Sequence, residues 1–325
     1  KILTNKHKII IPLAGMNVFG CWQKIMEGWC MSWFKEKCRW LNKPSRIAYV
    51  FLFPSAVLLL MFNVYPLLAS FYISTLDMKV SFDSAKFIGL GNYVEAFQDK
   101  YFLNSLGITL KYTLMEVPIQ MVMGLVLSAL LTKNTLRNQI FRSIYFLPIV
   151  CSATVVGVMW NLILHSNIGI VSHWLWKLGV QQTGFLTQPS TALHVVIFVS
   201  VWRTFGISTI ILVSAMQNVP HDYYEAAEID GAGKIRQFFS ITLPCIKPSF
   251  WFLLMTRVIG SLQVFDIVYT LTKGGPSHST ETLVTYVYDK AFVSSTRMGY
   301  ATAMSEFLFL IIMILTIVQY VIMNK

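Results

Sequence analysis

Residues Ala301–Met323 read ATAMSEFLFLIIMILTIVQYVIM, and the only charged side chain among them is that of Glu306. A helix that crosses the hydrocarbon of a bilayer needs about 20 mostly apolar residues, because each residue rises about 1.5 Å along the helix. This stretch meets that requirement. It predicts a membrane-spanning helix at the end of the chain.

Five further stretches of the same kind precede it, separated by polar segments with Gly, Pro and Asn. They lie near Ile47–Ser70, Leu106–Leu131, Phe141–Leu164, Ala192–Met216 and Phe250–Leu271. Of the 325 residues, 55% are hydrophobic and only 13% are charged, whereas about a quarter of a soluble domain is charged. This composition excludes a water-soluble globular protein and a disordered chain. We therefore expect an all-α membrane protein with six transmembrane helices.

The lysines and arginines predict how the chain is oriented. With six spans both termini share one side, and that side has 16 lysines and arginines against 8 on the other. Because positive residues are retained in the cytoplasm, both termini are expected there. The net charge of +11 is then explained by the anionic lipid of the cytoplasmic leaflet, and nucleic acid is not expected as a partner.

Residues 1–46 form a separate N-terminal segment, and residues 47–325 form the six-helix domain. The apolar run Ile9–Phe19 follows three lysines and resembles a signal peptide, but a cleaved terminus would contradict the charge distribution. Four tryptophans fall within about 40° of one another on a helix: Trp22, Trp29, Trp33 and Trp40. This stripe predicts an amphipathic helix that lies on the membrane surface or packs against a partner protein.

Several classes of site are not supported by the residues. The five cysteines are odd in number and lack paired zinc spacing, so we expect free thiols and no metal site. The six histidines show no metal-like spacing either, which disfavours a membrane enzyme. A proton-driven carrier that uses Glu116, Asp266 or Glu306 should have two repeated halves, and no such repeat is visible.

The polar segment 218–244, between the fourth and fifth spans, is the most informative loop. Pro220 and Asp222 are typical of a helix start, and the acids in Glu225-Ala-Ala-Glu favour its N-terminal half. Gly231 and Gly233 permit a sharp reversal before a second short helix that ends at Pro244. Such a helix–turn–helix is suited to a groove in another protein.

This loop resembles the "EAA" loop of permease subunits of bacterial ATP-binding-cassette importers, through Glu225-Ala-Ala, Gly231, Ile241 and Leu243-Pro244. Three other segments resemble the carbohydrate-uptake branch, which includes maltose, multiple-sugar and glycerol-phosphate permeases: Phe87–Tyr93, Phe141–Pro148 and Phe265–Pro276. The resemblance covers about residues 47–325.

The resemblance implies the type I importer permease fold in the bacterial inner membrane. It also implies three kinds of partner: a second homologous permease subunit, two ATPase subunits and an extracytoplasmic solute-binding protein. The chain has no Walker Gly-x-x-x-x-Gly-Lys-Ser/Thr motif, so ATP and Mg are expected on the ATPase partners and no cofactor on this chain. The residues expected to couple to the ATPase are Glu225, Ala226, Ala227, Asp230, Gly231 and Gly233.

The family resemblance also implies a substrate path on the two spans that flank the loop. The expected path residues are Ser200, Arg203, Thr204 and Ile207 before the loop, and Arg257, Gly260, Ser261 and Val264 after it. The members of each set recur at helical spacing and share one helix face. The maltose permease has neutral or apolar residues at the two arginine positions, which puts a neutral maltodextrin in doubt.

Two arginines inside spans indicate an anionic substrate, because a guanidinium binds carboxylate or phosphate in a bidentate fork. We expect an oligouronide such as an alginate or pectin fragment, with a neutral oligosaccharide or a glycerophosphodiester as alternatives. Structural ion pairs are a second interpretation. Asp266 is too far along one straight helix from Arg257, so the expected partner is Glu306 or an acid of the second subunit. Glu116 is expected near the outer end of its span.

Overall fold

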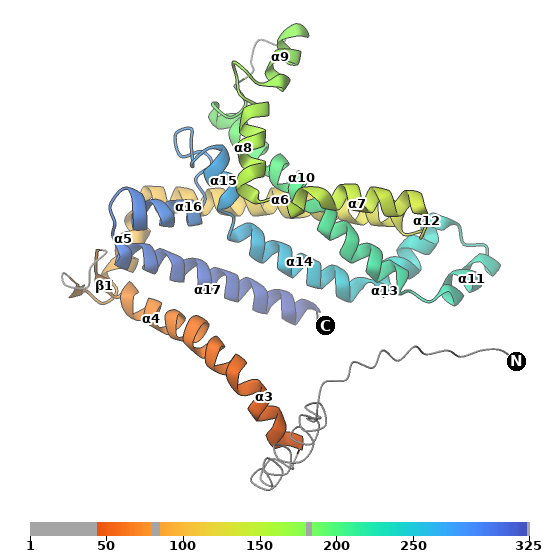
Figure 1. Ribbon diagram of the computed structural model, residues 1–325, viewed down its shortest axis with the longest axis horizontal. Helices are drawn as coiled ribbons and strands as arrows, with labels where there is room; N and C mark the ends of the chain where they lie inside the picture. The colour runs from red at the N-terminus through yellow and green to blue at the C-terminus, as the bar shows by residue number, and fades with distance from the viewer. Residues whose placement is uncertain (1–43, 80–84, 180–183, 324–325) are drawn as a thin grey trace, which may run out of the picture. The chain divides into compact units, whose positions relative to one another are not determined.

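The computed structural model describes residues 44–79, 85–179 and 184–323. The tryptophan stripe predicted within residues 1–43 lies outside them. The elements, most of which are labelled in Figure 1, are α3 (Pro44–Leu59), the π-helical turn η2 (Leu60–Val64), α4 (Tyr65–Ser74), β1 (Leu76–Asp77), β2 (Lys86–Phe87), α5 (Gly91–Gln98), α6 (Lys100–Leu131), α7 (Leu136–Val150), α8 (Ala153–Ile163), α9 (Ile170–Lys177), α10 (Pro189–Gln217), α11 (His221–Ile229), α12 (Lys234–Gln237), the π-helical turn η4 (Phe238–Thr242), α13 (Leu243–Cys245), α14 (Lys247–Leu262), α15 (Asp266–Leu271), α16 (Leu283–Tyr288), the π-helical turn η5 (Asp289–Val293) and α17 (Met298–Met323).

The described helices fit a multi-pass membrane protein. Four are long and apolar enough to cross a bilayer alone: Phe51–Ser74, Lys100–Leu131, Pro189–Gln217 and Met298–Met323. Two bent helix pairs bring the number to six when each pair counts as one span. The predicted all-α membrane class is confirmed. The chain divides into two units between Leu68 and Ala69, and the second unit contains every helix from α5 to α17.

The third predicted span, Phe141–Leu164, is not one helix. It consists of α7 and α8, which meet at 95°, and Figure 1 shows α8 standing across the direction of α6 and α7. Pro148 lies in the last turn of α7. Proline lacks a backbone donor and crowds the preceding turn, which favours a break nearby.

The fifth predicted span, Phe250–Leu271, is also interrupted. Its main helix, α14, has 16 residues, fewer than the about 20 that cross a bilayer. A bend of 69° separates α14 from the Lys234–Cys245 segment. Residues 263–265 then separate α14 from the short helix α15. The prediction of one continuous helix was wrong, and this break positions part of the candidate functional site.

Helix α10 is the centre of the second unit. Buried residues make up 61% of its most apolar stretch, and it packs against α6, α7 and α14. A Cβ atom on Gly206 would lie 1.9 Å from the carbonyl oxygen of Tyr145. Only glycine therefore permits α7 to approach this closely, as small residues do in membrane helix packing.

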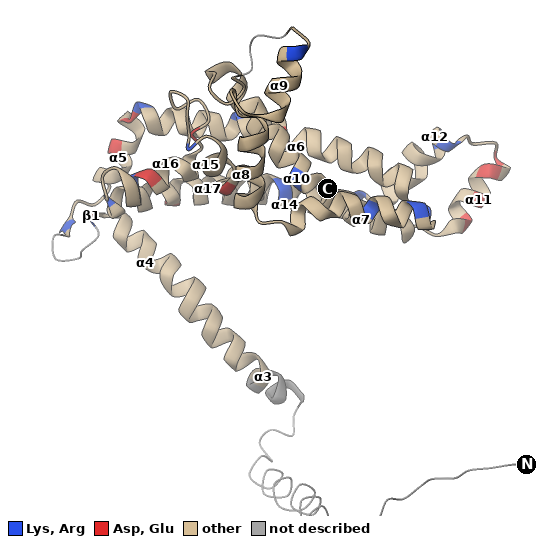
Figure 2. Ribbon diagram, turned by 45° about the horizontal axis from the view of Figure 1, so that its top comes forward, with Lys and Arg blue, Asp and Glu red and all other residues tan. Residues whose placement is uncertain are grey.

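Polar contacts join α5, α6, α16 and α17 at the end of the unit opposite α11. Asp99 caps α6 and accepts hydrogen bonds from the hydroxyls of Tyr286 and Tyr300. Burial opposes ionisation of Asp99, but these bonds prevail and lower its pKa. A hydrogen bond from Arg297 likewise lowers the pKa of Glu95. Figure 2 shows charged residues gathered around this end and around α11 and α12.

Candidate functional site: a polar cavity and an exposed loop

A polar cavity lies inside the helix bundle, where α6, α10 and α14 meet the break before α15. Its volume is about 190 Å³, and its lining is formed by Tyr112, Glu116, Ala153, Ser200, Arg203, Thr204, Arg257, Gly260, Ser261, Gln263, Val264, Phe265, Asp266 and Ile267. The interruption of the fifth span brings Gln263, Phe265 and Asp266 to this wall.

Seven of the eight residues expected on the substrate path line this one cavity. Ser200, Arg203 and Thr204 come from α10, and the four expected after the loop come from α14 and the following break. The structure thus brings together two sets that the sequence could only place on separate helix faces. Ile207, one helical turn beyond Arg203 along α10, is not part of the lining.

Arg257 forms an ion pair with Glu116 of α6. The distance from Arg257 Nη2 to Glu116 Oε1 is 2.7 Å, and the exposed fractions of the two side chains are 17% and 1%. The same nitrogen also lies 3.3 Å from the Thr204 hydroxyl. The partner expected for Arg257 was Glu306 or an acid of another subunit. Arg257 instead pairs with Glu116, an acid of the same chain on α6.

The position of Glu116 was therefore predicted wrongly, and its part in the cavity was missed. It lies in the middle of the 32-residue helix α6 and not near its outer end. A signal for this was present, because buried polar residues recur along α6 at intervals of three or four: Ser105, Thr109, Thr113, Glu116 and Gln120. Such a polar stripe within an apolar span faces the protein interior.

A hydrogen-bonded network holds the α6–α10 side of the cavity. Gln120 donates from Nε2 to the Ser208 hydroxyl at 2.9 Å and to the Thr204 carbonyl at 3.1 Å. The Thr204 hydroxyl donates to the Ser200 carbonyl at 2.7 Å. Because these groups are buried, leaving any of them unpaired is costly, and they define the wall beside the ion pair.

Arg203 differs from Arg257. Within residues 44–79, 85–179 and 184–323 Arg203 forms no ion pair and no hydrogen bond, whereas Arg257 pairs with Glu116. The Nε atoms of both arginines are buried without a hydrogen-bond partner. Asp266 also lines the cavity and is exposed. The lining therefore has two formal positive charges, on the two arginines, and two formal negative charges, on Glu116 and Asp266. Only Arg257 and Glu116 form a direct ion pair within this lining. Glu306 lies elsewhere, accepting a hydrogen bond from Ser70.

The expected coupling loop forms a short helix, α11, that ends in a tight reversal. Pro220 precedes it and Asp222 lies in its first turn, as predicted. Glu225 faces His221 across one turn at 2.9 Å. Glu225 and Ala226 are exposed, Ala227 is half-buried, and Asp230 is the C-terminal cap.

Gly231 makes the reversal possible. Its φ of +76° is one that residues with a Cβ rarely adopt. The Gly231 amide donates to the Glu228 carbonyl, and the Ala232 amide donates to the Ala227 carbonyl at 2.8 Å. This is a Schellman ending, which satisfies the last carbonyls of α11. Gly233 has φ −68° and caps α12, so no positive φ requires glycine there.

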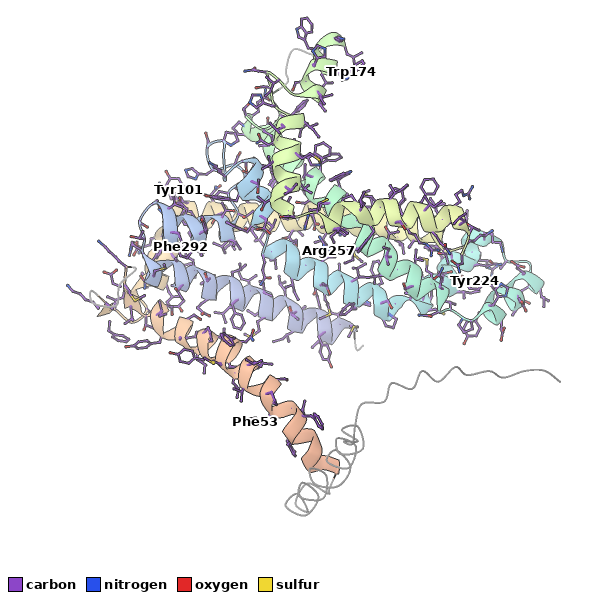
Figure 3. The ribbon with its side chains drawn as sticks, in the orientation of Figure 1. Phe53, Tyr101, Trp174, Tyr224, Arg257 and Phe292 are labelled. Atoms are coloured by element: carbon purple, nitrogen blue, oxygen red, sulfur yellow. The ribbon has the colours of Figure 1, made fainter. Side chains whose placement is uncertain are left out.

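One tertiary hydrogen bond connects α11 to the helix that leads into the cavity. The Tyr224 hydroxyl lies 2.8 Å from the hydroxyl of Thr242 in η4. The surface of this region is both charged and apolar, because its exposed acidic and basic side chains lie among four apolar or aromatic side chains that are between 54% and 87% exposed: Tyr223, Ile229, Ile235 and Phe239. Figure 3 places Tyr224 near one end of the unit and Arg257 near its middle.

The described residues hold no group of three or more His, Cys, Asp or Glu side chains that could bind a metal ion. Cys151 and Cys245 are free thiols, and the other three cysteines lie outside the described part of the chain.

Comparison with known proteins identifies the family. Residues 120–325 match the family described as "Binding-protein-dependent transport system inner membrane component". Similar relatives include the sulfoquinovosyl glycerol permease SmoG of Agrobacterium fabrum (34% identity over 86% of this chain and 91% of that protein), the lactose permease LacF of Rhizobium radiobacter (34%, 84% and 92%) and the trehalose/maltose permease MalF of Thermococcus litoralis (30%, 85% and 93%).

Solved structures show the same fold. A bacterial ABC transporter involved in the import of the acidic polysaccharide alginate has a chain that matches with a TM-score of 0.76 at 23% identity, over 90% of this chain and 98% of that one. The alginate transporter in complex with a pentasaccharide-bound periplasmic protein matches with a TM-score of 0.75 at 24% identity, over 88% and 95%.

In this family ATP hydrolysis is carried out by a separate subunit, and the permease subunit has no cofactor. The same family assignment is supported by the membrane spans, by the loop before the fifth span and by the match over most of the chain. The chain belongs to the binding-protein-dependent inner membrane components and is a multi-pass permease subunit of a sugar-type ABC importer.

Proposed function

We propose that this permease carries an anionic oligosaccharide, with Arg203 as the contact for its carboxylate or phosphate. The observation that carries the proposal is that Arg203 lines the cavity but forms no ion pair and no hydrogen bond with any described residue, while its Nε is buried. Arg257 contributes less charge than the sequence suggested, because Glu116 neutralises it at 2.7 Å. The proposal therefore rests on one arginine.

The physical argument is the cost of an unpaired guanidinium inside a membrane protein. On insertion-based scales an arginine at the centre of a span costs about 2.5–3.5 kcal/mol. An anionic sugar offsets this cost by pairing its negative charge with the guanidinium through bidentate hydrogen bonds, whereas a neutral sugar can only accept hydrogen bonds and leaves the positive charge unpaired. Family membership does not select the charge, since the relatives are named for the sulfonated sulfoquinovosyl glycerol and for uncharged lactose alike.

The proposed assembly contains a second homologous permease, two ATPase subunits and an extracytoplasmic solute-binding protein. Helix α11 docks on one ATPase through its exposed face, with Glu225, Ala226 and the Gly231 reversal at the contact. Movement of α11 then passes through η4 and α13 to α14, which carries Arg257 at the cavity. Both termini lie in the cytoplasm, as the excess of lysine and arginine on that side favours.

The substrate proposal is tested in liposomes that contain the whole complex, fed by its binding protein. An oligouronide should be imported and should stimulate ATP hydrolysis, and the neutral oligosaccharide of equal length should do so poorly. Arg203→Leu should lower uptake of the oligouronide at least tenfold while the complex still assembles. The matched control is Arg137→Leu, because Arg137 is exposed on α7 and is not part of the cavity lining.

Two results would contradict the proposal. One is import of the oligouronide by Arg203→Leu at the parental rate. The other is equal stimulation of the parental complex by the neutral sugar. That second result would favour the alternative, a neutral oligosaccharide importer, for which Asp266 is the supporting observation because its charge offsets that of Arg203 within the lining.

The orientation is tested by labelling single engineered cysteines with a reagent that does not cross membranes. Ser277 and Lys234 are both exposed, so accessibility within the protein does not differ between them. Labelling from outside at Ser277 and not at Lys234 supports cytoplasmic docking of α11, and the reverse pattern would overturn it.

A further inference from the structure

Four aromatic rings form a continuous series that begins at the cavity. Phe265 of the cavity lining stacks on Tyr269, with ring centroids 5.2 Å apart and planes inclined by 22°. Tyr288 contacts both of these rings, at 5.0 and 5.2 Å. Phe292 continues from Tyr288 at 5.4 Å. We call these four residues the aromatic wall.

The aromatic wall does not belong to the hydrophobic core. None of its rings is a member of the three clusters of buried apolar residues in the described chain. Phe292 is 61% exposed, and the other three are partly exposed. Figure 3 shows Phe292 toward the end of the unit away from Tyr224, with Arg257 between them. The series therefore leads from that end of the unit to the cavity.

The two wall tyrosines also keep their hydroxyls free. Neither Tyr269 nor Tyr288 makes a side-chain hydrogen bond to any described residue, whereas the nearby Tyr286 and Tyr300 both donate to Asp99. Tyrosines that serve only to join helices normally use their hydroxyl when they are buried. Free hydroxyls on partly exposed rings offer both of the contacts that a sugar unit makes.

The volume of the cavity indicates what the aromatic wall could bind. Its volume of about 190 Å³ is below the ~300–1,000 Å³ of pockets that enclose a whole small-molecule ligand. An oligosaccharide that places one unit beside Arg203 must extend its other units beyond the cavity. The aromatic wall is the surface that continues from Phe265, and ring faces with their negative quadrupole attract the weakly positive C–H face of a sugar ring.

We propose that the aromatic wall binds successive sugar rings of an oligosaccharide whose leading unit occupies the cavity. The proposal rests on the proposed saccharide transport and adds a determinant of chain length. It does not depend on the charge of the sugar, because stacking uses the C–H faces of the rings and leaves the carboxylates to Arg203.

The test compares import of a dimer and a tetramer of one uronic acid by the reconstituted complex with saturating, loaded binding protein. Tyr288→Leu and Phe265→Leu remove a ring and keep an apolar side chain. Phe252→Leu is the matched control, because Phe252 is an exposed ring of α14 that belongs neither to the wall nor to the cavity. All variants receive the same binding protein, so a change in the tetramer-to-dimer ratio reports the permease.

Each wall variant should lower the tetramer-to-dimer ratio by about twofold to tenfold, the range expected from loss of one aromatic contact. Tyr288→Phe, which retains the ring, should keep most of the ratio, and Phe252→Leu should not change it. An unchanged ratio in the wall variants, or an equal loss of dimer and tetramer import, would overturn the proposal. Failure of the wall variants to assemble with the second permease would overturn it too and assign the wall to a subunit interface. Dimer import by the parental complex separately tests the proposed function.

Discussion

The ion pair between Arg257 and Glu116 predicts that the two cavity arginines respond oppositely to the same substitution. In Arg257→Leu, Glu116 remains as an unpaired carboxylate that is 1% exposed. Removing one partner of a buried ion pair costs about 3–5 kcal/mol, because the other charge stays desolvated. In Arg203→Leu no described acid loses a partner, and leucine is favoured over arginine by about 3 kcal/mol within a span.

The assay is thermal unfolding of the purified complex in detergent. Unfolding is measured as the loss of the assembled form on size-exclusion chromatography. Arg257→Leu should be less stable than the parent by about 3 kcal/mol or more, which is roughly a hundredfold in the folded-to-unfolded ratio. Arg203→Leu should be as stable as the parent or more stable. The double variant Glu116→Leu, Arg257→Leu should recover most of the loss, since it removes both charges together.

The reasoning is refuted if Arg257→Leu unfolds at the parental temperature, or if the double variant is less stable than Arg257→Leu. Either result would mean that Glu116 finds another partner or water when the guanidinium is removed. The comparison also separates stability from transport, because Arg203→Leu is expected to assemble normally and lose uptake of an acidic sugar.

Three further predictions concern the two ends of the unit. Gly231→Ala should reduce substrate-stimulated ATP hydrolysis, because a Cβ at φ +76° costs about 1–2 kcal/mol of backbone strain. The strain comes from the backbone conformation alone, since the space around Gly231 is open. Gly233→Ala, at φ −68°, should have little effect on this activity. Tyr224→Phe removes the hydroxyl that is hydrogen-bonded to Thr242 at 2.8 Å. It should lower the amount of substrate imported per ATP hydrolysed by severalfold in a transport assay, whereas Tyr223→Phe should not. Because the pKa values of Glu95 and Asp99 are lowered in the folded protein, their ionised carboxylates stabilise it above the ordinary carboxyl pKa of about 4, and this contribution is lost as the pH falls further. The melting temperature should therefore decrease when the pH is lowered beyond about 4. The decrease should be less steep in Asp99→Asn.

Local features of the sequence were enough to predict the fold class and the helix and reversal within residues 218–244. The length of each apolar stretch is a local property, so the spans were recognised without knowledge of their neighbours. Pro220, Asp222 and Gly231 act within their own turn of chain, and the structure has the helix start and the reversal where they predict them. The breaks near Pro148 and at residues 263–265 were missed, because a continuous apolar run does not reveal a bend.

The lining of the cavity was predictable in part for the same reason. Residues three, four and seven apart share one face of a helix whatever surrounds it, so the sets around Arg203 and Arg257 could be assembled from spacing together with the family resemblance. What sequence alone determined is therefore which residues face the same way on one helix. Only the tertiary structure decided that the two faces line one cavity, that Ile207 falls outside it, and that Glu116, 141 positions from Arg257 in the chain, neutralises that arginine. The physical reason is that an ion pair depends on a separation of a few ångströms between side chains, and the packing of α6 against α14 sets that separation.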